Sequence, residues 1–410
     1  ELTGDLSGTP ETFDASDAPV QTADGVYQIS TAEELKWFAG LVNGTLTDGP
    51  EQNTAANAIL INDIDLNNES WTPIGFFDPN TEKIVDYTGT FDGDGHTISG
   101  LHIAGAGLYQ GFVGALGEEG TVQNLGIVDS SITGAAAVGG VCGYNDEGFI
   151  INCYSTSTVT AKGFEMDEDI LAAVGGVCGY NYGYVTNCYN TGTVTGTGDG
   201  IGGVCGQSYG YATNCYNTGT VTGTGNGIGG VCGQNNGDVT NSYNKGDVNT
   251  AGKSSIAILG GVCGYNEDGN VENCYNTGAI SFAGTADVAA VGGVCGYNDG
   301  GGVAYCYNAG EVSGEAESTD TYTGSVCGLN EPGGTIKNCY YITGTDSAAI
   351  QKNEAAFRSG EVCFLLNGSM SDQENVWRQN LDSSKDNFPV LDSTHAIVYA
   401  SGTCSNATYN

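Results

Sequence analysis

The stretch GGVCGQSYGYATNCYNTGTVTG, from Gly202 to Gly223, decides the fold, because similar stretches recur along the chain. Aligned on their first cysteine, the copies are separated by 36, 27, 27, 31, 32 and 32 residues, with anchors at Cys142, Cys178, Cys205, Cys232, Cys263, Cys295 and Cys327. An earlier copy, residues 111–128, has no cysteine, so the seven anchored copies and this one make about eight. Self-similarity at such a period is the signature of a solenoid.

Each copy contains three short runs that favour β-strands, and tight bends of Gly and Asn separate them. In the quoted copy these runs are residues 203–207, 211–217 and 220–222. A unit this small cannot bury its inner face alone, so neighbouring units must stack. We therefore predict an all-β fold, a right-handed parallel β-helix of about eight three-stranded coils. At about 4.8 Å per coil, the rod would be on the order of 40 Å long.

The sequence predicts three regions. Residues 1–105 should form an N-terminal cap with one short helix and leading β-helix strands, residues 106–345 the repeats, and residues 346–410 a C-terminal cap. Ser30 and Glu33 have the spacing of a capping box at the start of the helix, and Gly44 can end it. Caps are expected because open strand edges at the end of a solenoid template aggregation.

The long copies carry their extra residues in one place, between the third run and the next GGVCG. These insertions are residues 162–169, 250–255, 283–287 and 315–321. Because the copies stack in register, we expect all four to project from one edge of the rod, where repeat proteins often bind partners.

The composition excludes several classes of function. Asp and Glu number 48 against 10 Lys and Arg, which gives a net charge of −38. Such a chain is unsuited to nucleic acid or to anionic lipid, and no run of about 18 apolar residues predicts membrane insertion. The 15 cysteines fit an oxidising compartment. Glu1 is typical of a trimmed, mature start, so we expect a secreted or cell-surface protein, of bacterial origin.

The pattern GGVCGYN…G.V.NCYNTG.V.G resembles the GLUG repeat, found in bacterial surface proteins and beside immunoglobulin-A-cleaving metallopeptidases. YQISTAEELKWFAGLVNG and GTFDGDGHTISGL resemble the segment that often precedes such repeats, and SGEVCFLLNG resembles their usual ending. The resemblance spans nearly the whole chain and implies a β-helix, a surface location and adhesion rather than a reaction. Cysteine in both strand positions departs from the apolar residues that are commoner in the family.

The paired cysteines have three interpretations. As disulfides within a coil, the pairs would be Cys142–Cys153, Cys178–Cys188, Cys205–Cys215, Cys263–Cys274, Cys295–Cys306 and Cys327–Cys339, with Cys363–Cys404 in the end cap. Cys232 would stay unpaired, because Ser242 stands at its partner position. The second interpretation is a small apolar core of free thiols, since Val113 and Leu125 occupy both positions in the first copy. A metal site is the third, although the ten- to twelve-residue spacing does not suit zinc.

A tyrosine follows the second cysteine position in successive copies and is the candidate ligand-facing column. Its members are Tyr189, Tyr216, Tyr243, Tyr275 and Tyr307. Flat aromatic faces suit glycans, and the alternative is a stacking ladder that stiffens the rod. Asn187, Asn214, Asn241 and Asn273, one position before the second cysteine position, predict a hydrogen-bonded ladder at a bend.

The sequence contains no recognised catalytic or cofactor motif, so we predict that the protein is not an enzyme. Asp92, Asp94 and His96 fit a tight turn better than a metal or catalytic cluster. We expect no cofactor, although the acidic residues 165–169 leave calcium open.

The leading function is a non-catalytic extracellular surface module, either an adhesin or a stiff structural spacer presenting loops from one edge. A carbohydrate-active β-helix enzyme and a filament subunit stacking end to end are the alternatives. The expected partners are a host or matrix glycan or protein, or neighbouring copies of the chain itself.

Overall fold

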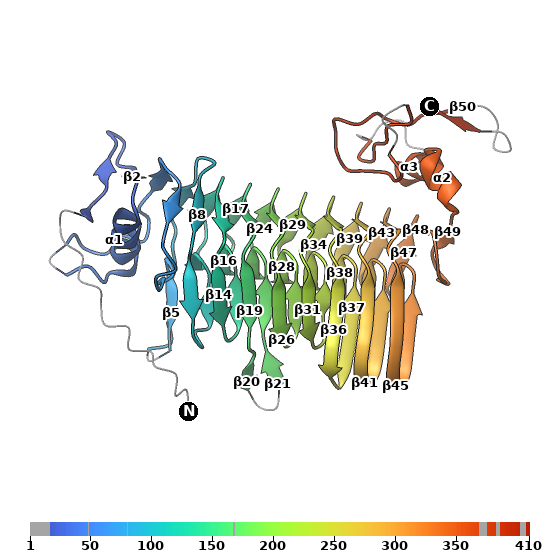
Figure 1. The fold of residues 1–410 in the computed structure, drawn as a ribbon, viewed down its shortest axis with the longest axis horizontal. Helices are drawn as coiled ribbons and strands as arrows, with labels where there is room; N and C mark the ends of the chain where they lie inside the picture. Colours follow the sequence, from blue (N-terminus) through green and yellow to red (C-terminus); the bar gives the residue numbers. More distant parts are fainter. Residues whose placement is uncertain are drawn as a thin grey trace.

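The computed structural model describes residues 17–47, 49–79, 81–166, 169–368, 375–382, 386–401 and 407–410, and it is a parallel β-helix (Figure 1). Four sheets run along the rod, and we call them walls 1 to 4 in the order in which the repeating coil visits them. Wall 1 has eight strands, while walls 2 and 3 have 12 and 11 because the capping regions extend them. The solenoid therefore has about 10 turns, slightly more than the eight predicted.

Wall 1 begins each coil at the first cysteine and comprises β11 (Val113–Leu116), β16 (Cys142–Asn145), β23 (Cys178–Asn181), β28 (Cys205–Ser208), β33 (Cys232–Asn235), β38 (Cys263–Glu267), β42 (Cys295–Asp299) and β46 (Cys327–Asn330). Wall 2 comprises β1 (Val20–Gln21), β2 (Tyr27–Ile29), β3 (Ala58–Leu60), β7 (Thr90–Asp92), β12 (Thr121–Gln123), β17 (Phe149–Ile151), β24 (Tyr184–Thr186), β29 (Tyr211–Thr213), β34 (Asp238–Thr240), β39 (Asn270–Glu272), β43 (Gly302–Ala304) and β47 (Thr335–Lys337). All neighbours in these two walls are parallel except β1 and β2.

Wall 3 comprises β4 (Ile64–Asp65), β8 (Thr97–Ser99), β13 (Gly126–Val128), β18 (Tyr154–Ser155), β25 (Tyr189–Asn190), β30 (Tyr216–Asn217), β35 (Tyr243–Asn244), β40 (Tyr275–Asn276), β44 (Tyr307–Asn308), β48 (Tyr340–Tyr341) and β49 (Ile350–Gln351). Wall 4 contains two strands per coil. The first are β9 (His102–Ala104), β14 (Ser131–Gly134), β19 (Thr158–Ala161), β26 (Val194–Thr197), β31 (Val221–Thr224) and β36 (Val248–Lys253). The second are β10 (Tyr109–Gln110), β15 (Ala137–Gly139), β22 (Ala173–Gly175), β27 (Gly200–Gly202), β32 (Ile228–Gly229) and β37 (Ile256–Gly260). The long strands β41 (Ile280–Gly292) and β45 (Val312–Gly324) complete this wall.

The coil therefore has more strands than the three predicted. The predicted middle run, residues 211–217, is divided into β29 and β30 by Asn214, whose φ of 55° is left-handed and cannot continue a strand. The residues before the GGVCG motif add a further strand, β32, to the same coil.

The core is a narrow column of small apolar side chains. In the quoted coil, Cys205, Ala212, Cys215 and Val221 are fully buried, and the register places the equivalent residues of adjacent coils directly above and below them. Each coil thus completes the core of its neighbours, as predicted for a solenoid.

Buried asparagine ladders lie inside two bends of the rod. One ladder runs Asn190, Asn217, Asn244, Asn276 and Asn308 along wall 3. Each amide before Asn308 donates one hydrogen bond to the next asparagine and one to the backbone two residues further on, which satisfies polar groups that water cannot reach. A separate ladder at the predicted position is more exposed, with Asn214 donating to Asn187 at 3.1 Å.

The insertions project from one edge of wall 4, as predicted. The hairpin of β20 (Phe164–Met166) and β21 (Asp169–Leu171) and the long strands β36, β41 and β45 all extend beyond the other coils at the same side of the rod (Figure 1).

The N-terminal region contains helix α1 (Ala32–Asn43), which Gly44 ends in a left-handed conformation, as expected. The capping box was predicted one residue early. Thr31 is the N-cap: its hydroxyl accepts from the Glu34 N–H at 3.2 Å, and the Glu34 carboxylate accepts from the Thr31 N–H. Phe38 packs edge-on against Tyr87, so the helix is joined to the first coils of the rod. A hairpin of β5 (Phe76–Asp78) and β6 (Lys83–Val85) lies beside them.

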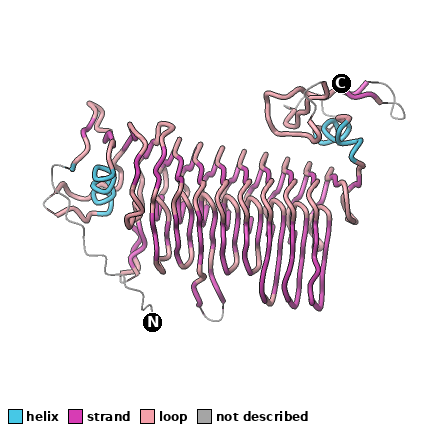
Figure 2. The backbone as a smooth tube through the Cα atoms, in the orientation of Figure 1, coloured by secondary structure: helices cyan, strands magenta, loops and turns pink. Residues whose placement is uncertain are grey.

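The C-terminal region contains α2 (Glu354–Arg358), α3 (Glu361–Leu366) and a hairpin of β50 (Ala400–Ser401) and β51 (Thr408–Tyr409). Figure 2 shows this region beside the last coils rather than across the end of the rod. The end of wall 1 is instead closed by Asp346, whose carboxylate accepts the N–H groups of Val326 and Cys327, both at 2.9 Å. Among the helices described, none is long and apolar enough to cross a membrane.

Candidate ligand-binding surface

The predicted tyrosine column is present on wall 3 as one continuous stack. Tyr154 begins it, and the rings of Tyr189, Tyr216, Tyr243, Tyr275 and Tyr307 follow with centroid separations of 4.7–5.0 Å and interplanar angles of 1–7° between these five. The spacing is that of the coils, because each tyrosine pairs in register with the next.

Two of the five predicted ligand-facing tyrosines are not available to a ligand. Tyr275 is 3% exposed and Tyr307 is fully buried, because the C-terminal region packs over them. Trp377 lies 5.5 Å from the Tyr307 ring, and the Tyr307 hydroxyl donates to the carbonyl of Pro389 at 2.7 Å. Tyr189, Tyr216 and Tyr243 remain half-buried. The column therefore anchors the C-terminal region at one end and stays open at the other.

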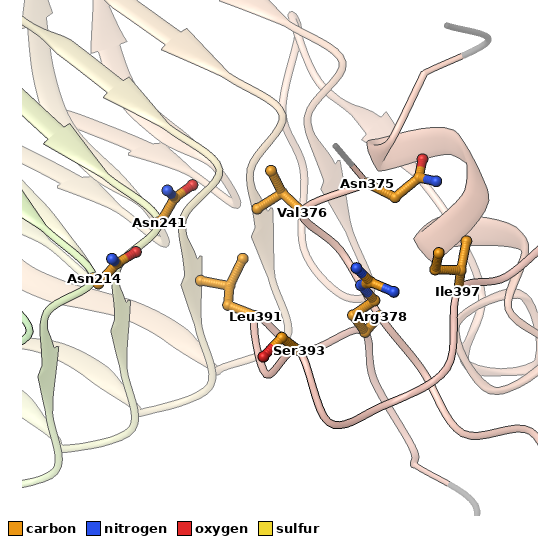
Figure 3. A pocket seen from close by; sticks show the side chains of 8 residues that line it. All are labelled: Asn214, Asn241, Asn375, Val376, Arg378, Leu391, Ser393 and Ile397. Carbon is orange, nitrogen blue, oxygen red and sulfur yellow. The ribbon is translucent and has the colours of Figure 1, made fainter. Parts of the chain in front are cut away.

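A cavity of about 520 Å³ lies where the C-terminal region meets the rod (Figure 3). Asn214 and Asn241 line it from the rod, and Val376, Arg378 and Leu391 line it from the C-terminal region. The cavity is a seam between two packed parts of the chain, with a single charged side chain in its lining.

A different aromatic surface, which the sequence reasoning missed, lies at the bend between walls 1 and 2. Tyr182 and Tyr209 stand at this bend in adjacent coils, and Tyr184 and Tyr211 follow two residues later at the start of β24 and β29. At the bend, the side chains of Tyr182 and Tyr209 are 40% and 43% exposed. On the strands, those of Tyr184 and Tyr211 are 41% and 45% exposed. Large side chains this exposed, in two adjacent coils, are unusual in a rod whose other aromatic rings are mostly covered.

The four exposed rings form two parallel stacks. Tyr182 and Tyr209 are 4.6 Å apart at 2°, and Tyr184 and Tyr211 are 5.0 Å apart at 8°. Phe149 extends the second stack by one coil, with its ring 5.0 Å from Tyr184. The stacks hold the rings in fixed positions, so a ligand would meet a preformed aromatic surface.

The same bend position carries acidic residues in the coils before Tyr182 and, after the neutral Asn236, again in the later coils. We call this series the bend column, and it consists of Glu118 and Glu119, Asp146 and Glu147, Tyr182, Tyr209, Asn236, Glu267 and Asp268, Asp299, and Glu331. A cavity of about 340 Å³ is lined by both acidic and aromatic side chains. They are Glu118, Glu119, Glu147, Phe149, Tyr182, Tyr184 and Tyr211.

The negative field of these carboxylates acts on the tyrosines. Burial and then the neighbouring Tyr209, Tyr109 and Asp146 raise the pKa of Tyr182, while burial and the charge of Glu267 raise the pKa of Tyr209. The pKa of Asp86 is raised by burial and by Asp146. The phenols of Tyr182 and Tyr209 therefore stay protonated and neutral, and they present hydroxyl donors and ring faces beside acidic side chains.

The cysteines form two buried columns of free thiols. All 14 cysteines in the described part of the chain are free, so the predicted pairs Cys142–Cys153, Cys178–Cys188, Cys205–Cys215, Cys263–Cys274, Cys295–Cys306 and Cys327–Cys339 are not formed. Cys404, the predicted partner of Cys363, lies outside the described residues. The register explains the difference: each first cysteine lies over the first cysteine of the next coil, and its thiol contacts a backbone carbonyl, as Cys178 does with Tyr180 at 3.1 Å.

These thiols should resist alkylation in the folded protein. Burial raises the pKa of thiols such as Cys205 and Cys232, and only the thiolate is a good nucleophile. We expect iodoacetamide to leave the native protein almost unmodified and to label at least 14 cysteines after denaturation without a reductant. Intact mass spectrometry measures both values. Labelling of only one or two cysteines in the denatured, unreduced protein would restore the disulfide interpretation.

Two further candidate metal or catalytic segments were named from the sequence, residues 92–96 and residues 165–169. Asp92 accepts from Gln123 and Asn124 and from the N–H of Asp94, whose φ is 48°, so this segment is a turn. No group of three or more His, Cys, Asp or Glu that could hold a metal occurs within the described ranges. The suggested calcium loop, residues 165–169, falls partly outside them.

Comparison with known proteins agrees with this architecture. The GLUG motif matches residues 134–160, 171–195 and 257–281, and the register of wall 1 shows that the intervening coils are built in the same way. The chain therefore contains GLUG repeats.

Two proteins are similar over longer stretches. Halomucin from Haloquadratum walsbyi is 36% identical over 140 residues, which are 34% of this chain and 2% of halomucin. The crystal structure of a candidate immunoglobulin A1 protease from Bacteroides ovatus matches 91% of this chain and 94% of its own, with 18% identity and a TM-score of 0.50. The second likeness shows a shared fold.

Proposed function

We propose that this chain is a rigid, non-catalytic module of an extracellular surface protein, and that it binds a partner through the bend column. The observation that carries the proposal is the double stack of four exposed tyrosines, Tyr182, Tyr184, Tyr209 and Tyr211, beside an acidic cavity. Preformed exposed aromatic surfaces rimmed by polar groups mark interaction sites.

The extracellular setting is supported by the GLUG repeats and by the similarity to halomucin. A net charge of −38 keeps such a protein soluble. The same charge repels the phosphates of nucleic acid, which is therefore not the proposed partner. The buried thiols are shielded from oxidants, so free cysteines are compatible with an oxidising environment.

Rigidity is supported by the ladders. The asparagine and tyrosine stacks connect successive coils through side chains as well as through the parallel sheets. A rod built in this way holds its bend column at a fixed distance from each end of the rod.

Removing the bend tyrosines should weaken binding strongly without affecting the fold. We expect the double variant Tyr182→Ala/Tyr209→Ala to bind at least about tenfold more weakly, because each ring contributes on the order of 1 kcal/mol of contact. The measurement is surface plasmon resonance of the purified chain against arrays of glycans and of basic, neutral and acidic peptides, with melting temperature as the check on folding.

The matched control is Tyr322→Ala/Tyr399→Ala, since these tyrosines are 41% and 62% exposed at other sites. An equal loss of binding in this control, or the absence of saturable binding by the unmodified chain, would refute the proposed function. Turnover of a glycan would support the carbohydrate-active enzyme instead, and rods that lengthen with concentration would support the filament.

A further inference from the structure

We infer that the bend column recognises a cationic ligand, namely an extended peptide segment of a partner protein that carries several Lys or Arg side chains. The inference rests on the proposed function, because it assigns a ligand chemistry to the same surface. It follows from the arrangement of charge along the rod, from the missing counter-charges and from the chemistry of the rings.

Carboxylates flank the tyrosines on both sides along the rod axis. Asp146 and Glu147 stand one coil before Tyr182, and Glu267 and Asp268 stand two coils after Tyr209. At about 4.8 Å per coil, the two acidic groups are separated by four steps, or about 19 Å. An extended peptide of about six residues covers that distance at about 3.3 Å per residue.

Counter-charges are missing from this surface. None of the ion pairs found in the described part of the chain includes a carboxylate of the bend column. The partners of these carboxylates are neutral donors: the Asn236 amide for Glu267, the Tyr265 hydroxyl for Asp299 and the Tyr297 hydroxyl for Glu331. The acidic series therefore keeps its full charge and attracts cations from solution.

The faces of the tyrosine rings favour a ligand with Lys or Arg side chains between the two acidic groups. A guanidinium or ammonium group over a tyrosine ring gains a cation–π interaction, and the aliphatic stem of Lys or Arg covers the remaining apolar area. Both stacks are open to solvent at Tyr182 and Tyr211, and Glu118, Glu119 and Glu147 line the same cavity. A neutral glycan would use the ring faces but would gain no charge attraction from the acidic coils, so charge complementarity favours the basic peptide.

The test uses a synthetic peptide with three arginines, acetyl-Arg-Gly-Arg-Gly-Arg-Gly-amide, and its counterpart with citrulline in place of each arginine. Citrulline keeps the shape and removes the charge. By isothermal titration calorimetry on the full chain, we expect the arginine peptide to bind at least about tenfold more tightly in low salt, and the difference to shrink as salt is added.

Two variants separate the local site from the overall charge. Glu119→Gln/Glu147→Gln/Glu267→Gln should weaken binding of the arginine peptide about tenfold. The control Glu51→Gln/Glu82→Gln/Glu311→Gln removes the same three charges from exposed positions away from the bend column and should change the affinity less than about twofold.

Several outcomes would overturn the inference. They are equal affinity for the arginine and citrulline peptides, equal effects of the two triple variants, or binding of calcium alone to the bend column. Binding of a neutral glycan that is lost in Tyr182→Ala/Tyr209→Ala but kept in the Glu119, Glu147 and Glu267 variant would overturn the cationic ligand while leaving the proposed function intact. If the unmodified chain bound neither the arginine peptide nor a glycan, that result would contradict the proposed function itself.

Discussion

Replacing Gly260 by alanine should unfold the central coils of the rod. A Cβ at this position would lie 1.8 Å from the carbonyl oxygen of Cys263 and 2.7 Å from the N–H nitrogen of Gly296, and both are backbone atoms. No rotamer change can relieve such a clash, so the coil must open. We expect a loss of more than about 3 kcal/mol in the free energy of unfolding, at or above the upper end of overpacking effects.

The measurement is urea denaturation followed by circular dichroism, together with limited proteolysis to locate the opening. Coils contact only their neighbours, so a defect in the middle should expose cleavage sites near residue 260 before the ends of the rod. Gly105→Ala is the matched control, because the atom nearest to a Cβ at this position, the Gly107 nitrogen, is 4.0 Å away. A melting temperature for Gly260→Ala within about 2 °C of the unmodified chain would contradict the prediction.

The same constraint applies to the other copies of the motif. The first glycine of GGVCG meets the carbonyl of the cysteine three residues later at 1.7–2.0 Å in every coil from Gly139 to Gly324. The second glycine is equally confined, since a Cβ on Gly203 would lie 2.1 Å from the carbonyl of Gly230 in the next coil. The two glycines let the backbone turn tightly and let adjacent coils approach each other.

Replacing Asn244 by alanine should also cause a large loss of stability. The Asn244 amide donates to Asn276 at 2.9 Å and to the carbonyl of Gly246 at 2.7 Å, and its oxygen accepts from Asn217 and from the N–H of Gly246. Removal leaves the N–H and the carbonyl of Gly246 without these partners inside the rod, at about 1–3 kcal/mol for each group left unpaired. It also removes one of the two partners of the Asn217 amide nitrogen and of the Asn276 amide oxygen. We expect a loss of about 4 kcal/mol, because some of the groups will recover a partner.

Chemical denaturation measures this loss, and Asn270→Ala provides the control. Asn270 donates a hydrogen bond to Asp238 at 2.8 Å, but it is exposed, so water can replace the bond and the cost should stay below about 1 kcal/mol. Equal effects of the two substitutions would show that the buried ladder adds nothing to the stability of the rod.

Much of the architecture was predictable because it follows from a local repeat. The period of the cysteines fixes how many residues form a coil, but the predicted number of coils was slightly low, because the capping regions add further turns beyond the eight strands of wall 1. The placement of the insertions on one edge follows from the same register. The sequence predicts a bend at Asn214 and also a single strand over residues 211–217, and the left-handed φ of Asn214 divides that strand into two.

The candidate site was harder to predict because it is defined by neighbours in space. The conspicuous tyrosines are those that repeat in every coil, and these are the ones used in packing, with Tyr307 fully buried by a region 82 residues away in sequence at Pro389. Tyr182 and Tyr209 interrupt a series that is otherwise acidic or amide. Comparing the bend position of each coil down the repeat would have revealed that interruption.

The sequence by itself determined the solenoid and the period of its coils, because each is a property of one repeating unit and of its contact with an identical neighbour. The tertiary structure alone decided which surfaces stay open. Exposure depends on how the C-terminal region folds back over wall 3 and on which side chains adjacent coils place next to each other. Neither is encoded within a single coil, so only the assembled rod shows that the tyrosines of the bend between walls 1 and 2 remain exposed.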